Sequence, residues 1–191
     1  MDSNLTIIFV PGNQTSRTHK GNETTKLWLG ALQTKFPHAH VQIINTPYDM
    51  WSKSDVELLI KSIKDTVSEY QNVILVGYSF GGLAIRITAD TLDDASHIKA
   101  LVSIGTPHRR LNLKQRRFVE SFGLKHAVSK PILAIGGWFD IFAAPFFLKP
   151  TTKEKYVVKI LPYTHRALFF SSRARKGIIK HLTNLLKLLS L

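Results

Sequence analysis

The sequence predicts an α/β protein in three layers: a mostly parallel sheet of about six strands with helices on both faces. Short apolar runs rich in Val and Ile alternate along the chain with longer segments in which apolar residues recur at helical spacing. Repeated strand–helix units of this size are typical of a parallel sheet covered by helices. With 191 residues, the chain is long enough for a substantial core, and we expect residues 1–191 to form one domain.

The N-terminal part of the chain contains two predicted strands and two predicted helices. The apolar run at 5–10 is a strand, because the turn residues Pro11, Gly12 and Asn13 follow it directly. Aromatic and leucine side chains three and four residues apart predict a helix at 25–36. A second strand at 41–45 and a longer amphipathic helix at 54–70 come next.

The rest of the chain repeats this alternation with one long polar interruption. The expected elements are a strand at 73–77, a helix that runs to about residue 92, a strand at 98–104, a helix around 113–126, a strand at 131–135, a strand at 156–161 and a C-terminal helix at 173–189. The segment between the strands at 98–104 and 131–135 has room for one helix but not for a folded cap domain, so we expect an uncapped site.

The sequence Gly77-Tyr78-Ser79-Phe80-Gly81 lies between a buried strand and a helix. A strand, a sharp glycine turn and a helix are the setting of a nucleophile elbow. Glycines on either side of the serine let the strand and the helix pass closely, and the serine itself sits at a strained backbone position. We therefore expect Ser79 to be a nucleophile.

Reactive side chains also follow three other predicted strands. A doubly wound sheet binds its ligands beyond the carboxyl ends of its strands. Gly105-Thr106-Pro107-His108 comes after the fourth strand, Trp138-Phe139-Asp140 after the fifth, and His165 after the sixth. A serine, an acid and a histidine thus reach one edge of the sheet in the chain order Ser, Asp, His.

These motifs, together with Phe9-Val10-Pro11-Gly12, carry a resemblance to the α/β-hydrolase superfamily. The chain looks like a compact, capless serine hydrolase of the lipase or esterase type over nearly its whole length. The resemblance implies ester hydrolysis and places Gly-Thr-Pro-His at the border of an acyl pocket. Two departures are the Pro-Gly-Asn turn, where many lipases carry His-Gly, and the lack of an evident lid insertion.

The chemistry of these groups predicts a role for each residue. His165 accepts the proton of Ser79, Asp140 orients His165, and the N–H groups of Phe80 and Asn13 bind the oxyanion. His108 is the competitor for His165, although it precedes the acid in the chain, and Asp49 is the alternative acid. The predicted substrate-binding residues are Gly12, Tyr78, Pro107, His108, Trp138, Phe139 and Phe142.

Composition limits the partners. The formal net charge of +13 favours anionic partners. We expect an ester or lipid ester as the substrate and no nucleic acid, since no recognition motif is present. The basic residues either form a solvated surface that keeps the protein soluble or allow peripheral contact with an anionic membrane. The chain has no cysteine, and we expect neither a metal nor an organic cofactor. It carries no evident signal peptide, which predicts a cytoplasmic protein, or a secreted one if a leader has been removed. We also expect a monomer.

The same three catalytic groups serve several reactions. Thioesterase, amidase and acyltransferase chemistry use this triad as ester hydrolysis does, and the sequence does not separate them. A non-catalytic binding protein that retains the fold is the alternative from another class.

Overall fold

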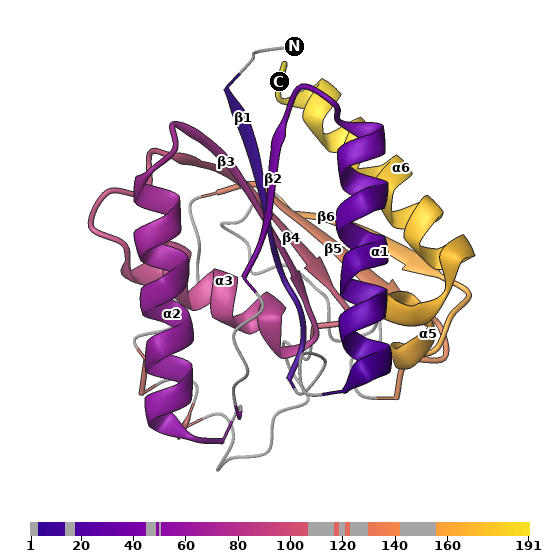
Figure 1. The fold of residues 1–191 in the computed structure, drawn as a ribbon, viewed down its shortest axis with the longest axis horizontal. Coiled ribbons are helices and arrows are strands. Elements are labelled where there is room, and N and C mark those ends of the chain that lie inside the picture. The colour runs from indigo at the N-terminus through magenta and orange to yellow at the C-terminus, as the bar shows by residue number, and fades with distance from the viewer. Residues whose placement is uncertain are drawn as a thin grey trace.

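The structure is a computed structural model, and it describes residues 4–13, 18–44, 49, 51–106, 117–118, 121–122, 130–141 and 156–191. In these ranges six strands form one all-parallel sheet between two layers of helices (Figure 1). The strand order is β2-β1-β3-β4-β5-β6. The strands are β1 (Leu5–Val10), β2 (His40–Ile43), β3 (Asn72–Tyr78), β4 (Ile98–Ile104), β5 (Ile132–Gly137) and β6 (Tyr156–Leu161).

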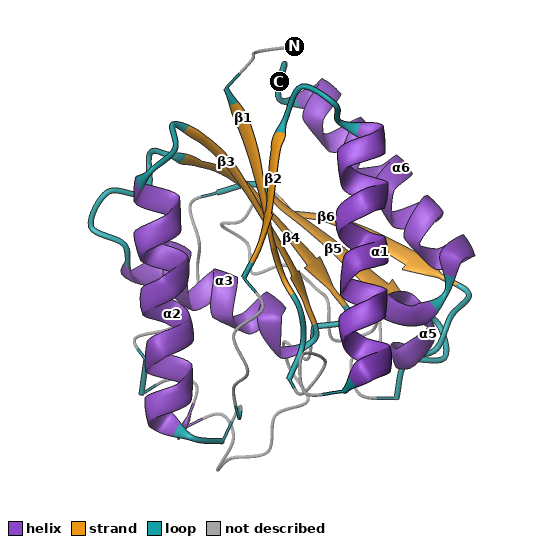
Figure 2. Ribbon diagram, viewed as in Figure 1, coloured by secondary structure: helices purple, strands orange, loops and turns teal. Residues whose placement is uncertain are grey.

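The helices divide between the two faces of the sheet. The helices are α1 (His19–Lys35), α2 (Lys53–Ser68), α3 (Phe80–Thr91), α5 (His165–Phe170) and α6 (Ser172–Leu188). Figure 2 shows α1, α5 and α6 on one face and α2 and α3 on the other. The predicted fold class is therefore confirmed, and every described strand pair is parallel. No helix in the described ranges is both long enough and apolar enough to cross a bilayer.

Each central strand contributes to two apolar cores. Successive side chains of a strand point to opposite faces of the sheet. In β1, Ile7 and Phe9 pack in the core beneath α1, α5 and α6, whereas Ile8 and Val10 pack in the core beneath α2 and α3. All six residues of β1 are buried, which explains why the strand is a continuous apolar run without polar alternation.

The structure differs from the predicted elements at several places. Strand β2 and helix α2 each end two residues before the predicted end. Helix α1 begins six residues before the predicted start, because Thr18 caps it by accepting a hydrogen bond from the N–H of Gly21. Helix α5, which begins at His165, was not predicted. Strand β5 continues to Gly137, two residues beyond the predicted end. The helix expected around 113–126 falls mostly outside the described residues, and of it Arg117 and Phe118 are helical.

Candidate active site

Ser79 lies in the sharp turn between β3 and α3. Its backbone angles are φ 53° and ψ −122°, and it is one of two non-glycine residues in the described ranges with a positive φ. Such a conformation is unfavourable for an L-residue and persists only where the surrounding structure enforces it. Here the N–H of Ser79 donates to the carbonyl of Ile104 over 2.8 Å, and its carbonyl accepts from Gly82 over 3.0 Å. The strained position predicted for Ser79 is present.

Glycines allow three segments to meet around this serine. A Cβ on Gly77 would lie 2.5 Å from the carbonyl oxygen of Gly81, so β3 and α3 pass one another in backbone contact. A Cβ on Gly12 would lie 2.9 Å from the Cβ of Ser79. Strands β1 and β3 are neighbours, but the strand that follows β1 is added on one side of the pair and the strand that follows β3 on the other. Doubly wound sheets bind their ligands at the carboxyl ends of two strands where the strand order reverses in this way.

A chain of two hydrogen bonds joins Ser79, His165 and Asp140. The Nε2 atom of His165 lies 3.0 Å from the Oγ of Ser79, and its Nδ1 atom lies 2.8 Å from the Oδ2 of Asp140. The side chain of Asp140 has no exposed surface, and that of His165 is 15% exposed. A neutral imidazole that donates from Nδ1 to the carboxylate presents a lone pair at Nε2 to the serine hydroxyl. The arrangement is therefore competent for general-base activation of Ser79.

Local structure fixes the acid and the histidine. Asp140 lies in a tight turn after β5, where its N–H donates to the carbonyl of Gly137 over 3.1 Å. His165 is the first residue of α5, whose N-terminus is capped by the hydroxyl of Thr164, which accepts from Ala167. Gly105 has φ +55°, and a Cβ there would lie 3.2 Å from the Nδ1 of His165. A side chain at position 105 would thus crowd the pair.

Tyr78 takes a place that the sequence analysis did not anticipate. It is 4% exposed, and its hydroxyl donates a 3.0 Å hydrogen bond to the backbone carbonyl of His165. Its ring lies 5.2 Å from the imidazole ring and stacks on Phe169 at 4.7 Å. Burial, reinforced by the Asp140 carboxylate, raises the pKa of Tyr78 above its ordinary value, so the hydroxyl remains a donor. Tyr78 therefore supports His165 from the core, and its role as a substrate contact stays a prediction.

We expect Tyr78→Phe to lower kcat for an activated ester roughly 5- to 10-fold with little change in KM. The substitution keeps the ring stack but removes the hydrogen bond that holds the backbone of His165. Tyr70→Phe is the matched control, because the Tyr70 hydroxyl bonds the exposed ring of His40, 3.1 Å away. Steady-state kinetics of both variants check this. An equal loss of kcat in the two variants, or a change in KM alone, would contradict a positioning role for Tyr78.

The other predicted substrate residues divide into three groups. Gly12 abuts Ser79, as described above, and Asn13 is the next residue in the chain. Trp138 and Phe139, on the turn that carries Asp140, are 58% and 61% exposed, so they present apolar surface next to the site. Pro107, His108 and Phe142 lie outside the described residues, and their roles stay predictions.

The oxyanion-binding groups remain predictions as well. Phe80 is the first residue of α3 and its side chain is buried. Its N–H therefore belongs to the first helical turn, where the helix dipole favours negative charge. Asn13 follows β1 on the neighbouring strand end. Both backbone groups thus come from segments that border Ser79.

The alternative acid and two of the remaining histidines, His40 and His97, occupy structural positions. An oxygen of Asp49 accepts from the N–H of Trp51 over 3.0 Å, which makes it part of the turn before α2. His40 stacks on Tyr70, and His97 contacts the carbonyl of Tyr70 and the carboxylate of Asp94. In the described ranges no group of three or more His, Cys, Asp or Glu residues is arranged to hold a metal ion.

The comparisons with known proteins agree with this architecture. No protein-family model matches the chain. A GPI inositol-deacylase of Candida albicans is 22% identical over an alignment 171 positions long, which covers 78% of this chain and 42% of that protein. The chain therefore spans less than half the length of that curated relative.

Two solved structures cover nearly the whole chain. An α/β hydrolase from the metagenome of sediments of the lagoon of Mar Chica, Morocco, superposes with a TM-score of 0.67, 16% identity and coverage of 98% of this chain and 93% of that one. The monoacylglycerol lipase of Paleococcus ferrophilus superposes with a TM-score of 0.63, 13% identity and coverage of 95% and 94%. The chain has the α/β-hydrolase fold, and lipases and esterases are among its structural neighbours.

Proposed function

We propose that this chain is a serine hydrolase that cleaves carboxylic esters through an acyl-enzyme intermediate. The observation that carries the proposal is the hydrogen-bonded series Ser79, His165 and Asp140, with Ser79 held at positive φ in a strand–turn–helix elbow. A serine in that conformation beside a properly oriented imidazole has the geometry of an activated nucleophile.

The residues then have defined tasks in the reaction. As the Oγ of Ser79 attacks the acyl carbon, its proton passes to the Nε2 of His165, and the resulting imidazolium is stabilised by the buried Asp140. The N–H groups of Phe80 and Asn13 bind the oxyanion of the tetrahedral intermediate. The imidazolium returns the proton to the leaving alcohol, and a water activated by the same imidazole releases the acid and restores Ser79.

An acyl group of apolar character fits the surroundings of the site best. Trp138, Phe139 and Ile141 are each more than half exposed and flank Asp140 on the same turn, so an acyl chain would cover apolar surface on the turn that carries the acid. The names of the relatives support this class: one is an inositol-deacylase and another a monoacylglycerol lipase. Thioester and amide cleavage and acyl transfer remain the alternatives on the same triad.

Labelling with a fluorophosphonate probe tests the proposal. We expect the wild-type protein to be labelled on Ser79, identified by peptide mass mapping, and to hydrolyse p-nitrophenyl acetate. Ser79→Ala should lose both the label and the turnover. Ser68→Ala is the matched control, because Ser68 is exposed on α2 and its hydroxyl bonds only the helix backbone. Folded wild-type protein that reacts with neither reagent would favour the non-catalytic alternative.

A further inference from the structure

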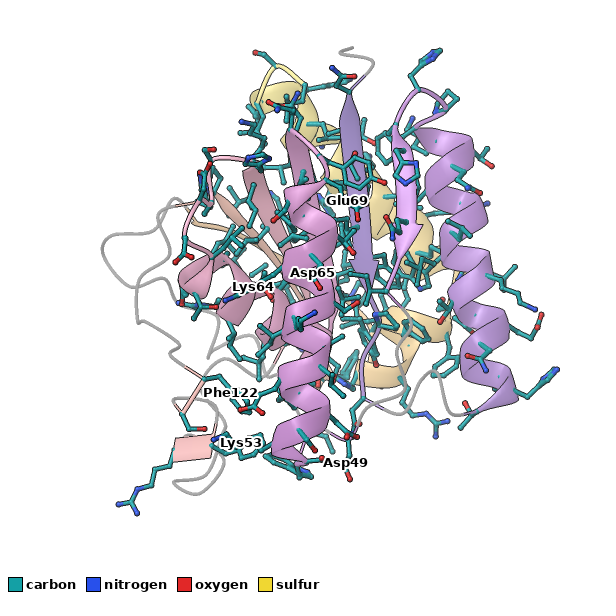
Figure 3. All side chains as sticks on the ribbon, turned by 60° about the vertical axis from the view of Figure 1, so that its left-hand side comes forward. Asp49, Lys53, Lys64, Asp65, Glu69 and Phe122 are labelled. Atoms are coloured by element: carbon teal, nitrogen blue, oxygen red, sulfur yellow. The ribbon has the colours of Figure 1, made fainter. Side chains whose placement is uncertain are left out.

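The two helical layers differ sharply in charge. Helices α1, α5 and α6 together carry nine Lys and Arg residues and one acidic residue, Glu23. Helices α2 and α3 carry four basic and four acidic residues, and Figure 3 shows how residues of both signs, such as Lys64 and Asp65, follow one another along α2. Eight of the nine cations are exposed, the exception being Arg175. Among the described helices, the net positive charge is therefore concentrated in the layer formed by α1, α5 and α6.

A groove with a basic rim runs between α1 and α6. Its volume is about 620 Å³, and Ala31 and Ile179 contribute apolar surface to it. The side chains of four lysines border it: Lys35 from α1 and Lys176, Lys180 and Lys187 from α6. Gly30 opens the groove further, because a Cβ at this position would meet no atom within 4 Å. The groove contains none of the three residues of the candidate active site.

Among the described residues, these lysines have no ion-pair partner that would stabilise the fold. In the part of the chain that the structure describes, no carboxylate lies within ion-pairing distance of any of the four. Lys176 and Lys180 are one helical turn apart on α6, where like charges repel. Such an unpaired basic rim is complementary to an anionic surface.

Exposed leucines lie beside the lysines. Leu27 is 57% exposed and precedes Ala31 by one turn of α1, and Leu188 is 77% exposed and follows Asn184 by one turn of α6. Lysines next to exposed aliphatic side chains are typical of helices that lie on membranes. No aromatic side chain lines the groove, whereas single-stranded nucleic acid requires aromatic rings on which bases stack. Lipid therefore fits this surface better than nucleic acid.

We propose that the outer face of α1 and α6, here called the α1–α6 face, docks on an anionic phospholipid bilayer. The ammonium groups of the four lysines contact lipid phosphates, and Leu27 and Leu188 enter the boundary between the headgroups and the acyl chains. The proposal does not depend on hydrolytic activity, since it uses none of the residues of the candidate active site. It assigns the membrane contact expected from the net charge to one surface of the molecule.

Vesicle sedimentation with two charge-matched variants tests the docking face. In the first variant Lys35, Lys176, Lys180 and Lys187 are changed to Gln; in the control Lys53, Lys61, Lys64 and Lys99 are changed to Gln. We expect wild-type protein to bind vesicles of phosphatidylcholine mixed with phosphatidylserine but not vesicles of phosphatidylcholine alone. Added salt should release the bound protein, because it screens the charges. The first variant should bind roughly 100-fold more weakly, since each lysine near the surface contributes separately, and the control should bind nearly as wild type does.

A fluorescent label provides a second, independent measurement. The chain has no cysteine, so Gly30→Cys places a single environment-sensitive dye in the groove, and Leu58→Cys places it on the exposed side of α2. With anionic vesicles we expect a blue shift from the first dye only. Absence of vesicle binding by wild-type protein, equal losses in the two lysine variants, or a shift from the Leu58 label alone would overturn the proposal. Circular dichroism of each variant establishes that it is folded.

Discussion

Asp140→Asn is expected to lower kcat/KM for p-nitrophenyl acetate by roughly 10⁴-fold while the protein stays folded. The Oδ2 of Asp140 lies 2.8 Å from the Nδ1 of His165, and its side chain is fully buried, so no water can replace it there. The amide N–H of asparagine can donate a hydrogen bond to Nδ1, which favours the tautomer that carries its proton on Nε2. That imidazole cannot accept the proton of Ser79.

Steady-state kinetics measure this loss, and Asp65→Asn is the control. Asp65 forms an exposed ion pair with Lys61 on α2, and exposed pairs contribute little to stability. We expect this variant to keep wild-type activity. A loss of less than about tenfold in Asp140→Asn would show that another group orients His165.

Gly77→Ala is expected to destabilise the protein by roughly 3 kcal/mol or more and to abolish turnover. A Cβ at Gly77 would lie 2.5 Å from the carbonyl oxygen of Gly81 and 2.6 Å from the Cα of Gly82. Both contacts are with backbone, so no side-chain rotation relieves them. Strand β3 and helix α3 must separate, and Ser79 then moves relative to His165.

Thermal unfolding followed by circular dichroism measures the effect, which we expect as a fall in Tm of about 6–12 °C for a chain of this size. Gly30→Ala is the control substitution, and we expect it to have the opposite effect on stability. Gly30 lies inside α1 with open space around its Cβ position, and alanine there should stabilise the helix by about 0.5–1 kcal/mol. If Gly77→Ala unfolded at the wild-type temperature, the close passage of β3 and α3 would not be a constraint on the fold.

The parts of the fold that the sequence predicts well are those in which one physical requirement dominates. Strands β1 and β4 have the predicted bounds, because buried parallel strands must be short apolar runs. The turn at Ser79 was predicted because few residues other than glycine permit two backbones to touch. The chain order of the serine, acid and histidine likewise follows from the strand ends at which each must lie.

The parts that were missed depend on contacts between distant residues. Helix α5 has six residues, too few for a helical pattern, and it is held in part by a 3.0 Å hydrogen bond from the indole of Trp28 to the carbonyl of Phe169. The place of Tyr78 was visible in principle, since Ile74, Val76 and Tyr78 alternate along β3 and all face the core beneath α1, α5 and α6. The basic groove could not be predicted, because α1 and α6 lie at opposite ends of the chain.

The all-parallel sheet has a consequence for how activity arises during folding. Parallel neighbours cannot be joined by tight hairpins, so every strand pair is closed by a long crossover, and such topologies fold slowly. The hydrogen bond between Ser79 and His165 spans 86 positions of the chain. His165 follows β6, and β4 and β5 lie between β6 and β3, so this bond needs the C-terminal half of the sheet in place. Under the function proposed above, recovery of hydrolytic activity would mark a late stage of folding rather than an early one.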